Sequence, residues 1–240
     1  GSGKSHFLKI LSYLLSNQEV CGKRAIDYFA DKFDDPMMYA QAVKSVSVPT
    51  QSILFNIDIE GPLTKDKTAV LRVFAKMFYN HCGFYGDDLK IAKLERFIEK
   101  QGKTQQFREA FEKVNGAPWT ETRDSFAFFE DDIVSVLQST LGMSEQAARN
   151  WFNGEETNEL SIAQLVADIQ EYVDGKGKDF RLLFMVDEVG QYIGDDGDLM
   201  INLQSLVEEI GIRCHGKVWV MVTSQEAIDS VVHITGNDFS

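Results

Sequence analysis

Hydrophobic residues recur along much of the chain at the three- and four-residue spacing of an amphipathic helix. Between about residues 65 and 175 this spacing continues almost without interruption, which predicts helices that each bury one face. Ser161 with Gln164 indicates the start of the last helix, and Gly175 its end. The stripes are Val70, Leu71, Phe74, Met77 and Phe78; Phe107, Phe111 and Val114; Phe126, Phe129, Ile133 and Leu137; and Ile162, Leu165, Val166, Ile169 and Val173.

Three apolar runs have the composition of strands. Residues 52–59 alternate and are rich in isoleucine, whereas residues 181–187 and 217–223 are continuous apolar runs, typical of a parallel sheet buried on both faces. A helical stripe over residues 199–210 lies between the last two runs, so strand, helix and strand form a βαβ unit. The predicted class is α/β, with a parallel sheet flanked by helices.

This order of elements predicts how the chain is divided. Residues 1–64 and 179–240 carry the predicted strands and form the two parts of an α/β core. Residues 65–178 form a large helical insert between them, which we expect to be a packed layer or subdomain. Aromatic stripes at helical spacing favour a hydrophobic core over a cofactor site.

Composition narrows the class of protein. Of the 240 residues, 44% are hydrophobic and 25% charged, as in an ordinary globular protein. The sequence has no apolar run of the ~20 residues that span a bilayer and no signal-peptide pattern, so we expect a cytoplasmic protein with no membrane association. The formal charge of −13, unrelieved by any Lys/Arg cluster, disfavours direct binding of nucleic acid by this segment.

The three cysteines do not suggest a disulfide framework. Cys21, Cys82 and Cys214 are odd in number and lack C-x-x-C spacing. Two of them have a histidine neighbour, His81 and His215, which raises the alternative of a split zinc site. Adjacent side chains rarely point the same way, so reduced thiols are the favoured interpretation.

The first five residues, GSGKS, match the end of a phosphate-binding loop. In the pattern G-x-x-x-x-G-K-[ST], Gly3, Lys4 and Ser5 fill the last three places, and the first glycine would precede residue 1. Gly1 and Ser2 alone have the alternative interpretation of an expression remnant. A helix should follow such a loop, and an apolar helical stripe does follow: Phe7, Leu8, Leu11, Leu14 and Leu15.

A pair of acidic residues, Asp187 and Glu188, ends the second apolar run. Ligands bind at the carboxyl ends of strands in open α/β sheets. Mg²⁺ on a nucleoside triphosphate needs hard oxygen ligands, which Ser5 and, through water, Asp187 supply. Glu188 would polarise the attacking water, and Lys4 would contact the outer phosphates as a point charge.

The third run also turns abruptly polar, at Thr223, Ser224 and Gln225. One of these side chains would act as a sensor by contacting the γ-phosphate or the lytic water. The alternative is that they only cap the strand end. The three pieces in this order, loop with helix, acidic strand end and polar strand end, predict a nucleotide site in which Lys4 and Asp187 converge.

Together these motifs resemble the P-loop ATPases of the AAA+-like (ASCE) group, which have an extra strand between the Walker A and Walker B strands. More narrowly, the chain resembles the large P-loop ATPase of the BREX bacteriophage-exclusion system, the BrxC/PglY family. The resemblance is carried by GSGKSHFLKILSYLL, RNWFNGE, FMVDEVGQYIGDDGDLMINLQSLVEEIG and KVWVMVTSQEAID.

The resemblance implies an assignment of roles. Nucleotide binding falls to Gly1, Ser2, Gly3, Lys4, Ser5 and His6, with Lys4 and Glu188 catalytic, Ser5 and Asp187 on Mg²⁺, and Thr223, Ser224 or Gln225 as sensor. The implied cofactors are ATP and Mg²⁺. The implied partners are other BREX defence proteins and further copies of the chain, bound through the ATPase core.

The chain also departs from the family, whose members are much longer. We expect a fragment that lacks the first Walker A glycine, the strand before it and everything after the third strand. Such a fragment should bind ATP poorly and be inactive alone. A trans-acting arginine finger is not assignable, and Arg213 is a weak candidate because it precedes the last strand.

Three functional hypotheses follow. The first is an Mg²⁺-dependent ATPase module of an anti-phage complex, in which the helical insert presents a protein-binding surface. The second is a nucleotide-regulated scaffold that hydrolyses little because turnover needs an arginine from a neighbour. The third is a DNA-remodelling motor, which the negative charge disfavours for this segment.

Overall fold

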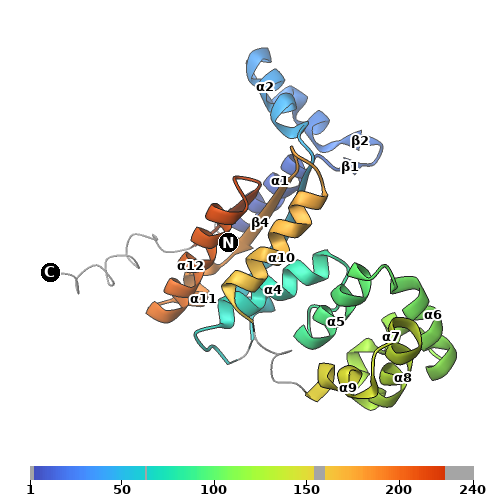
Figure 1. Cartoon of the computed structure of the whole chain (residues 1–240). Coiled ribbons are helices and arrows are strands. Elements are labelled where there is room, and N and C mark those ends of the chain that lie inside the picture. The colour runs from blue at the N-terminus through green and yellow to red at the C-terminus, as the bar shows by residue number, and fades with distance from the viewer. Residues whose placement is uncertain (1–2, 63, 154–159, 225–240) are drawn as a thin grey trace. The chain divides into compact units, whose positions relative to one another are not determined.

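The computed structural model describes residues 3–62, 64–153 and 160–224 (Figure 1). The described residues form two compact units. Unit 1 comprises the residues up to Val73 and those from Ser161 onward, and unit 2 comprises Phe74–Leu160. Gly1, Ser2 and Gln225 lie outside the described residues.

Unit 1 is a mixed α/β unit that contains the predicted parallel sheet. Helix α4 (Ala69–His81) begins in unit 1 and continues into unit 2. The other elements of unit 1 are α1 (Lys4–Ser16), β1 (Glu19–Val20), β2 (Lys23–Arg24), the 3-10 helix η1 (Ala25–Lys32), α2 (Pro36–Val46), β3 (Thr50–Asn56), α3 (Ile57–Glu60), α10 (Ile162–Gly175), β4 (Arg181–Asp187), α11 (Val189–Ile193), α12 (Gly197–Arg213) and β5 (Val218–Val222).

The three strands of the main sheet run parallel in the order β3-β4-β5. Central strand β4 is buried from Leu182 to Asp187, which confirms the prediction from its continuous apolar run. Leu8 of α1 packs against Leu183 and Met185 on one face of the sheet. Helices α10 and α12 cover the other face (Figure 1). The carboxyl ends of all three strands therefore meet at one edge of the sheet.

Two strand predictions need correction. The run predicted as a strand over 52–59 forms β3 only as far as Asn56, because the Asn56 side chain accepts hydrogen bonds from Asp58 N and Ile59 N and so starts helix α3. The run at 217–223 forms β5, but it is not buried on both faces. Trp219 is 54% exposed, because β5 is an edge strand among the described residues.

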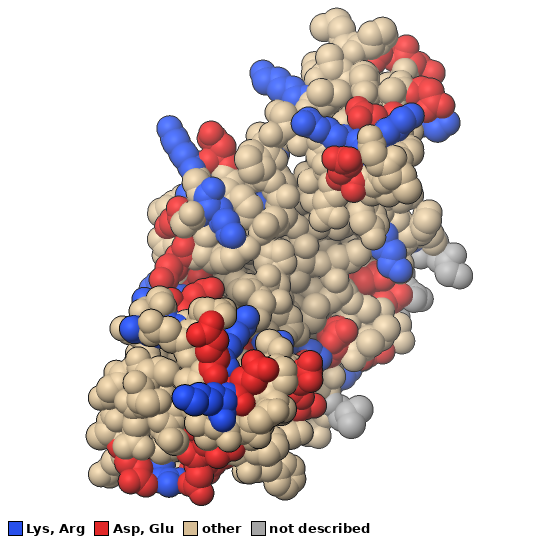
Figure 2. Space-filling model, turned by 90° about the vertical axis from the view of Figure 1, so that its right-hand side faces the viewer, with Lys and Arg blue, Asp and Glu red and all other residues tan. Residues whose placement is uncertain are grey.

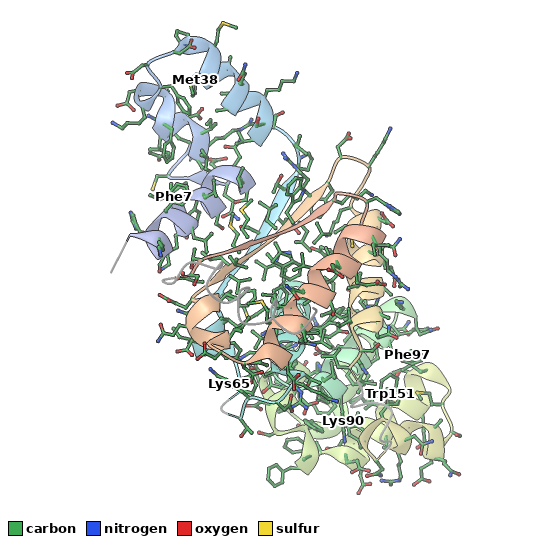
Figure 3. All side chains as sticks on the ribbon, turned by 90° about the vertical axis from the view of Figure 1, so that its left-hand side faces the viewer. Phe7, Met38, Lys65, Lys90, Phe97 and Trp151 are labelled. Carbon is green, nitrogen blue, oxygen red and sulfur yellow. The ribbon has the colours of Figure 1, made fainter. Side chains whose placement is uncertain are left out.

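Unit 2 is entirely helical in its described residues. Its core is a separate cluster of buried side chains drawn from several helices, with Phe97 and Trp151 packed at its margin, their ring centroids 5.3 Å apart (Figure 3). Beyond the end of α4, its elements are α5 (Leu89–Lys100), α6 (Thr104–Asn115), α7 (Trp119–Thr122), the 3-10 helix η2 (Arg123–Phe128), α8 (Glu130–Leu141) and α9 (Glu145–Asn153).

The boundaries of unit 2 differ from the insert expected at 65–178. Helix α10 lies within that expected range but belongs to unit 1, where it packs on α12. Its start agrees with the sequence, since Ser161 Oγ accepts a hydrogen bond from Gln164 N at 3.1 Å, and it ends at Gly175. Periodicity predicts that a helix exists but not which hydrophobic core it joins.

A buried carboxylate organises the core of unit 2. Glu95 is 8% exposed and accepts hydrogen bonds from Trp119 Nε1 at 2.7 Å and from the Arg123 guanidinium at 2.8 Å. The Trp119 ring meets Phe107 and Phe111 edge-on, with centroids 5.2 and 5.0 Å away. A buried charge is tolerated when it is paired and hydrogen-bonded in this way.

The cysteines are free thiols in different environments. Cys21 is exposed, Cys82 half-buried and Cys214 buried. No group of three or more His, Cys, Asp or Glu side chains within residues 3–62, 64–153 and 160–224 is arranged to hold a metal ion. The same residues contain no helix long and apolar enough to cross a membrane.

Cys214 is expected to resist alkylation far longer than Cys21. Burial, reinforced by the negative charge of Asp174, raises the pKa of the Cys214 thiol from 9.0 to about 11. At pH 8 only about one Cys214 thiol in a thousand would be ionised, and the thiolate is the reactive form. Iodoacetamide labelling followed by peptide mass spectrometry should mark Cys21 first, and Cys214 labelling should rise as pH approaches 11. Equal labelling rates in the folded protein at pH 8 would contradict the burial of Cys214.

Candidate nucleotide site at the strand ends

The candidate site lies where β4 and β5 end beside each other. Val186 and Val222 are register partners in the parallel ladder, so Asp187 and Thr223 leave the sheet as neighbours. Two backbone bonds extend the pairing past the ladder: Thr223 N donates to Val186 O at 2.9 Å, and Val189 N donates to Thr223 O at 3.0 Å. The two strand ends are therefore held together by the backbone before any side chain contributes.

The Thr223 hydroxyl connects both acidic residues. It donates a hydrogen bond to Asp187 Oδ1 and accepts one from Glu188 N at 3.2 Å. Asp187 is only 9% exposed, so this hydroxyl supplies a donor to a nearly buried carboxylate. The sequence predicted polar residues here but did not predict that Thr223 would contact Asp187 and Glu188.

Glu188 adopts a left-handed backbone conformation, with φ 63° and ψ 29°. Residues other than glycine rarely take this conformation, which costs of the order of 1 kcal/mol. Glu188 caps helix α11, and its carbonyl accepts a hydrogen bond from Tyr192 N at 3.1 Å. The chain thus reverses sharply at the strand end and leaves the Glu188 side chain half-buried.

Lys4 reaches the same strand end from the first turn of α1. Its ammonium group donates a hydrogen bond to the carbonyl oxygen of Ser224. Lys4 and Asp187 are therefore connected through two consecutive residues, Thr223 and Ser224. The geometry brings the Lys4 ammonium to the strand end whose neighbouring residue, Thr223, contacts the Asp187 carboxylate and the backbone of Glu188.

The amino end of α1 has the features of an anion site. Gly3 precedes it in a left-handed conformation with φ 76°, and no side chain caps the helix. The first intrahelical bond runs from Phe7 N to Gly3 O, so the first turn contains backbone N–H groups without intrahelical acceptors. Its first turn carries no acidic residue. Such an end favours phosphate or another anion.

The remaining predicted site residues are less closely tied to this centre. Ser5 is half-buried and His6 is exposed in the first turn of α1. Gly1, Ser2 and Gln225 were also predicted to belong to the site but lie outside the described residues. Arg213 forms an ion pair with Glu209 one helical turn earlier, Nε to Oε1 at 2.6 Å.

A hydrated Mg²⁺ would fit the donors at this edge. Thr223 donates to Oδ1 of Asp187, so Oδ2 is the oxygen that a metal-bound water would contact. Ser5, in the first turn of α1, would supply the direct hydroxyl ligand. These are hard oxygen donors of the kind that Mg²⁺ prefers, and two of them are enough when phosphate oxygens and waters supply the rest.

Gly190 is a site residue that the sequence analysis did not single out. A Cβ atom at this position would lie 1.9 Å from Ser224 Oγ and 2.9 Å from Ser224 Cβ. The start of α11 therefore packs directly on the end of β5. A glycine two residues after the Asp-Glu pair is the signal that would have indicated this close approach.

Comparison with known proteins gives no independent assignment. No protein-family model matches the chain, and no solved structure matches it significantly.

Proposed function

We propose that the chain is an ATP-binding and Mg²⁺-dependent ATP-hydrolysing P-loop module, of the kind its sequence resembles in the BREX anti-phage ATPases. The observation that carries this proposal is the convergence of Lys4, from the start of α1, with Asp187 and Glu188 at the residues that end β5. A cation, an uncapped helix start and paired carboxylates at a strand end suit a metal-bound polyphosphate.

Each residue has a distinct part in this mechanism. The backbone N–H groups at the start of α1 and the Lys4 ammonium would bind the outer phosphates, while Ser5 and Asp187 would hold the hydrated Mg²⁺. When bound, the metal neutralises charge that develops on the phosphates. Glu188 would orient and polarise the attacking water as a general base. Thr223 and Ser224 hold these groups at one edge of the sheet.

The sheet order also supports the proposal. Strand β3, which precedes β4 in the chain, pairs along one side of β4, and β5 pairs along the other. The P-loop ATPases that the chain resembles have an extra strand between the Walker A and Walker B strands. Strand β3 lies between α1 and β4 in the chain and would be that strand. Asp187 thereby ends the strand that is paired on both sides, and Glu188 follows it directly.

Replacing Lys4 with alanine should weaken ATP binding by about 10- to 100-fold, the value of one charge-assisted hydrogen bond. The measurement is titration of the full-length protein with a fluorescent ATP analogue, with and without Mg²⁺. Lys9→Ala is the matched control, because Lys9 is an exposed lysine on the same helix. Equal affinity in the Lys4 and Lys9 variants would refute the nucleotide site.

A nucleotide-regulated scaffold with little hydrolysis is the second candidate. The ion pair between Arg213 and Glu209 favours a scaffold, because Arg213 was the candidate arginine finger and this pair already binds its guanidinium. A scaffold would assemble on adding ATP yet release negligible phosphate. On the face in Figure 2, acidic and basic side chains are interspersed, and with a charge of −13 this disfavours the third candidate, a DNA-remodelling motor.

A further inference from the structure

The hydroxyl group of Thr223 is already fully engaged within the protein as a donor. A threonine hydroxyl has a single proton to donate and two lone pairs to accept with. Thr223 donates its proton to Asp187 Oδ1 and accepts the backbone N–H of Glu188. It therefore has no proton left for a phosphate oxygen while these bonds persist.

We propose that Thr223 is a positioning residue for Asp187 and Glu188, and not the γ-phosphate sensor that its place in the sequence suggests. This inference rests on the proposed nucleotide site for its functional meaning. Thr223 fixes the orientation of the Asp187 carboxylate and holds the backbone of Glu188. It acts on the reaction through these two residues and touches no reacting atom.

The backbone of Glu188 explains why such a residue is needed. Its left-handed conformation persists only where surrounding bonds hold it. Thr223 supplies two of them, since its side chain accepts from Glu188 N and its carbonyl accepts from Val189 N. The direction of the Glu188 side chain depends on this backbone conformation, so loss of the hydroxyl would change where its carboxylate points.

The hydrogen bond from the Thr223 hydroxyl to Asp187 orients the Asp187 carboxylate. Asp187 is nearly buried, and Thr223 fixes one of its oxygens so that the second keeps a defined direction. In metal sites, partners that orient a ligand typically change metal affinity or activity by about 10- to 100-fold when they are removed. Ser224, the next residue, accepts from Lys4, so the same strand end contacts both halves of the site.

The test uses Thr223→Val, which keeps the shape but removes the hydroxyl, and Thr223→Ser, which restores it. Thr140→Val is the matched control, because Thr140 lies in unit 2 and bonds only along its own helix, to Val136 O at 2.6 Å. In full-length protein, Thr223→Val should raise the Mg²⁺ concentration for half-maximal hydrolysis and lower kcat, each by about 10-fold or more. Thr223→Ser and Thr140→Val should stay near the parent.

A sensor role makes a different prediction for nucleotide discrimination. The ratio of ATP to ADP affinity, measured without Mg²⁺, should be unchanged in Thr223→Val if the residue only positions the carboxylates. A fall of about 10-fold in that ratio, the value of one lost hydrogen bond to a charged phosphate, would overturn the proposal. An unchanged Mg²⁺ requirement together with an unchanged kcat would overturn it equally.

Amide hydrogen exchange separates this inference from the proposed function. The Glu188 N–H should exchange about 10-fold faster in Thr223→Val than in the parent, in the absence of any nucleotide, because its acceptor is gone. An unchanged exchange rate would overturn the positioning role whatever the protein binds. If Glu188 N–H exchanges faster in Thr223→Val but the parent protein binds no nucleotide, the contact between Thr223 and Glu188 is confirmed and the ATPase proposal is refuted.

Discussion

Substitution of Glu188 by glutamine is expected to lower phosphate release by a factor of about 10² to 10⁴ while leaving ATP binding close to that of the parent. Glutamine keeps the size and the backbone N–H that bonds Thr223, but it cannot accept a proton from water. In the proposed site the contacts to ATP come from α1 and Mg²⁺, so ATP binding should be unaffected. The measurements are steady-state phosphate release and nucleotide titration on the same protein sample.

Two comparisons make this result specific. Glu208→Gln removes an exposed carboxylate from α12 and should hydrolyse at the parental rate, which controls for the loss of one negative charge. Lys4→Ala should lose binding and hydrolysis together. If Glu188→Gln releases phosphate as fast as the parent, Glu188 is not the base, although nucleotide binding at α1 would still stand.

The second large effect is expected in unit 2. Trp119→Ala should destabilise this unit by about 3–5 kcal/mol, the range for truncating a large buried aromatic residue. The ring is 2% exposed and packs edge-on against Phe107 and Phe111, and its Nε1–H satisfies the buried Glu95 carboxylate. Hydrogen exchange of α5, α6 and α8, measured with increasing urea, reports the stability of this unit directly.

A conservative variant separates packing from hydrogen bonding at Trp119. Trp119→Phe keeps a ring beside Phe107 and Phe111 but removes the indole N–H that donates to Glu95. Unit 2 should therefore be destabilised by about 1–3 kcal/mol relative to the parent. Strand β4 and helix α10 belong to unit 1 and should keep their protection in both variants. Equal loss of protection in both units would contradict the independence of the two cores.

Much of the secondary structure could be predicted from local pattern. The buried run at 181–187 is strand β4, and the capping residue Ser161 begins α10. These predictions succeeded because a strand buried on both faces is continuously apolar, and because a cap acts within one turn. The strand predicted over 52–59 extended too far, because the Asn56 side chain captures the following N–H groups and starts a helix.

Position within the tertiary structure was harder to predict than element type. The run at 217–223 has the composition of a buried strand, yet Trp219 is half-exposed at the sheet edge. Helix α10 looks from its periodicity like one more helix of the insert, but it packs on α12. Both outcomes depend on which distant segments lie alongside, and a single sequence carries no direct signal for that.

The sequence singled out several residues that lie near one another in the structure, but it did not predict the contacts between them. Glycine-lysine-serine loops and polar strand ends have recognisable sequence patterns. These patterns pointed to Lys4, Asp187, Glu188 and Thr223. The bond between Thr223 and Asp187 joins residues 36 positions apart, and no local pattern indicates which of three polar side chains makes it. The identity of the donor matters for the proposed positioning role, because a hydroxyl that donates to Asp187 has no second proton for a phosphate oxygen.

The contact between Gly190 and Ser224 couples two positions that are far apart in the sequence. The side chain of Ser224 occupies the space where a Cβ atom of residue 190 would lie, so the side chains at these two positions compete for the same space. Any larger residue at 190 would have to be matched by a smaller one at 224, or the end of β5 would be displaced together with the carbonyl that holds Lys4. A substitution at residue 190 is therefore expected to be tolerated only together with a smaller residue at 224.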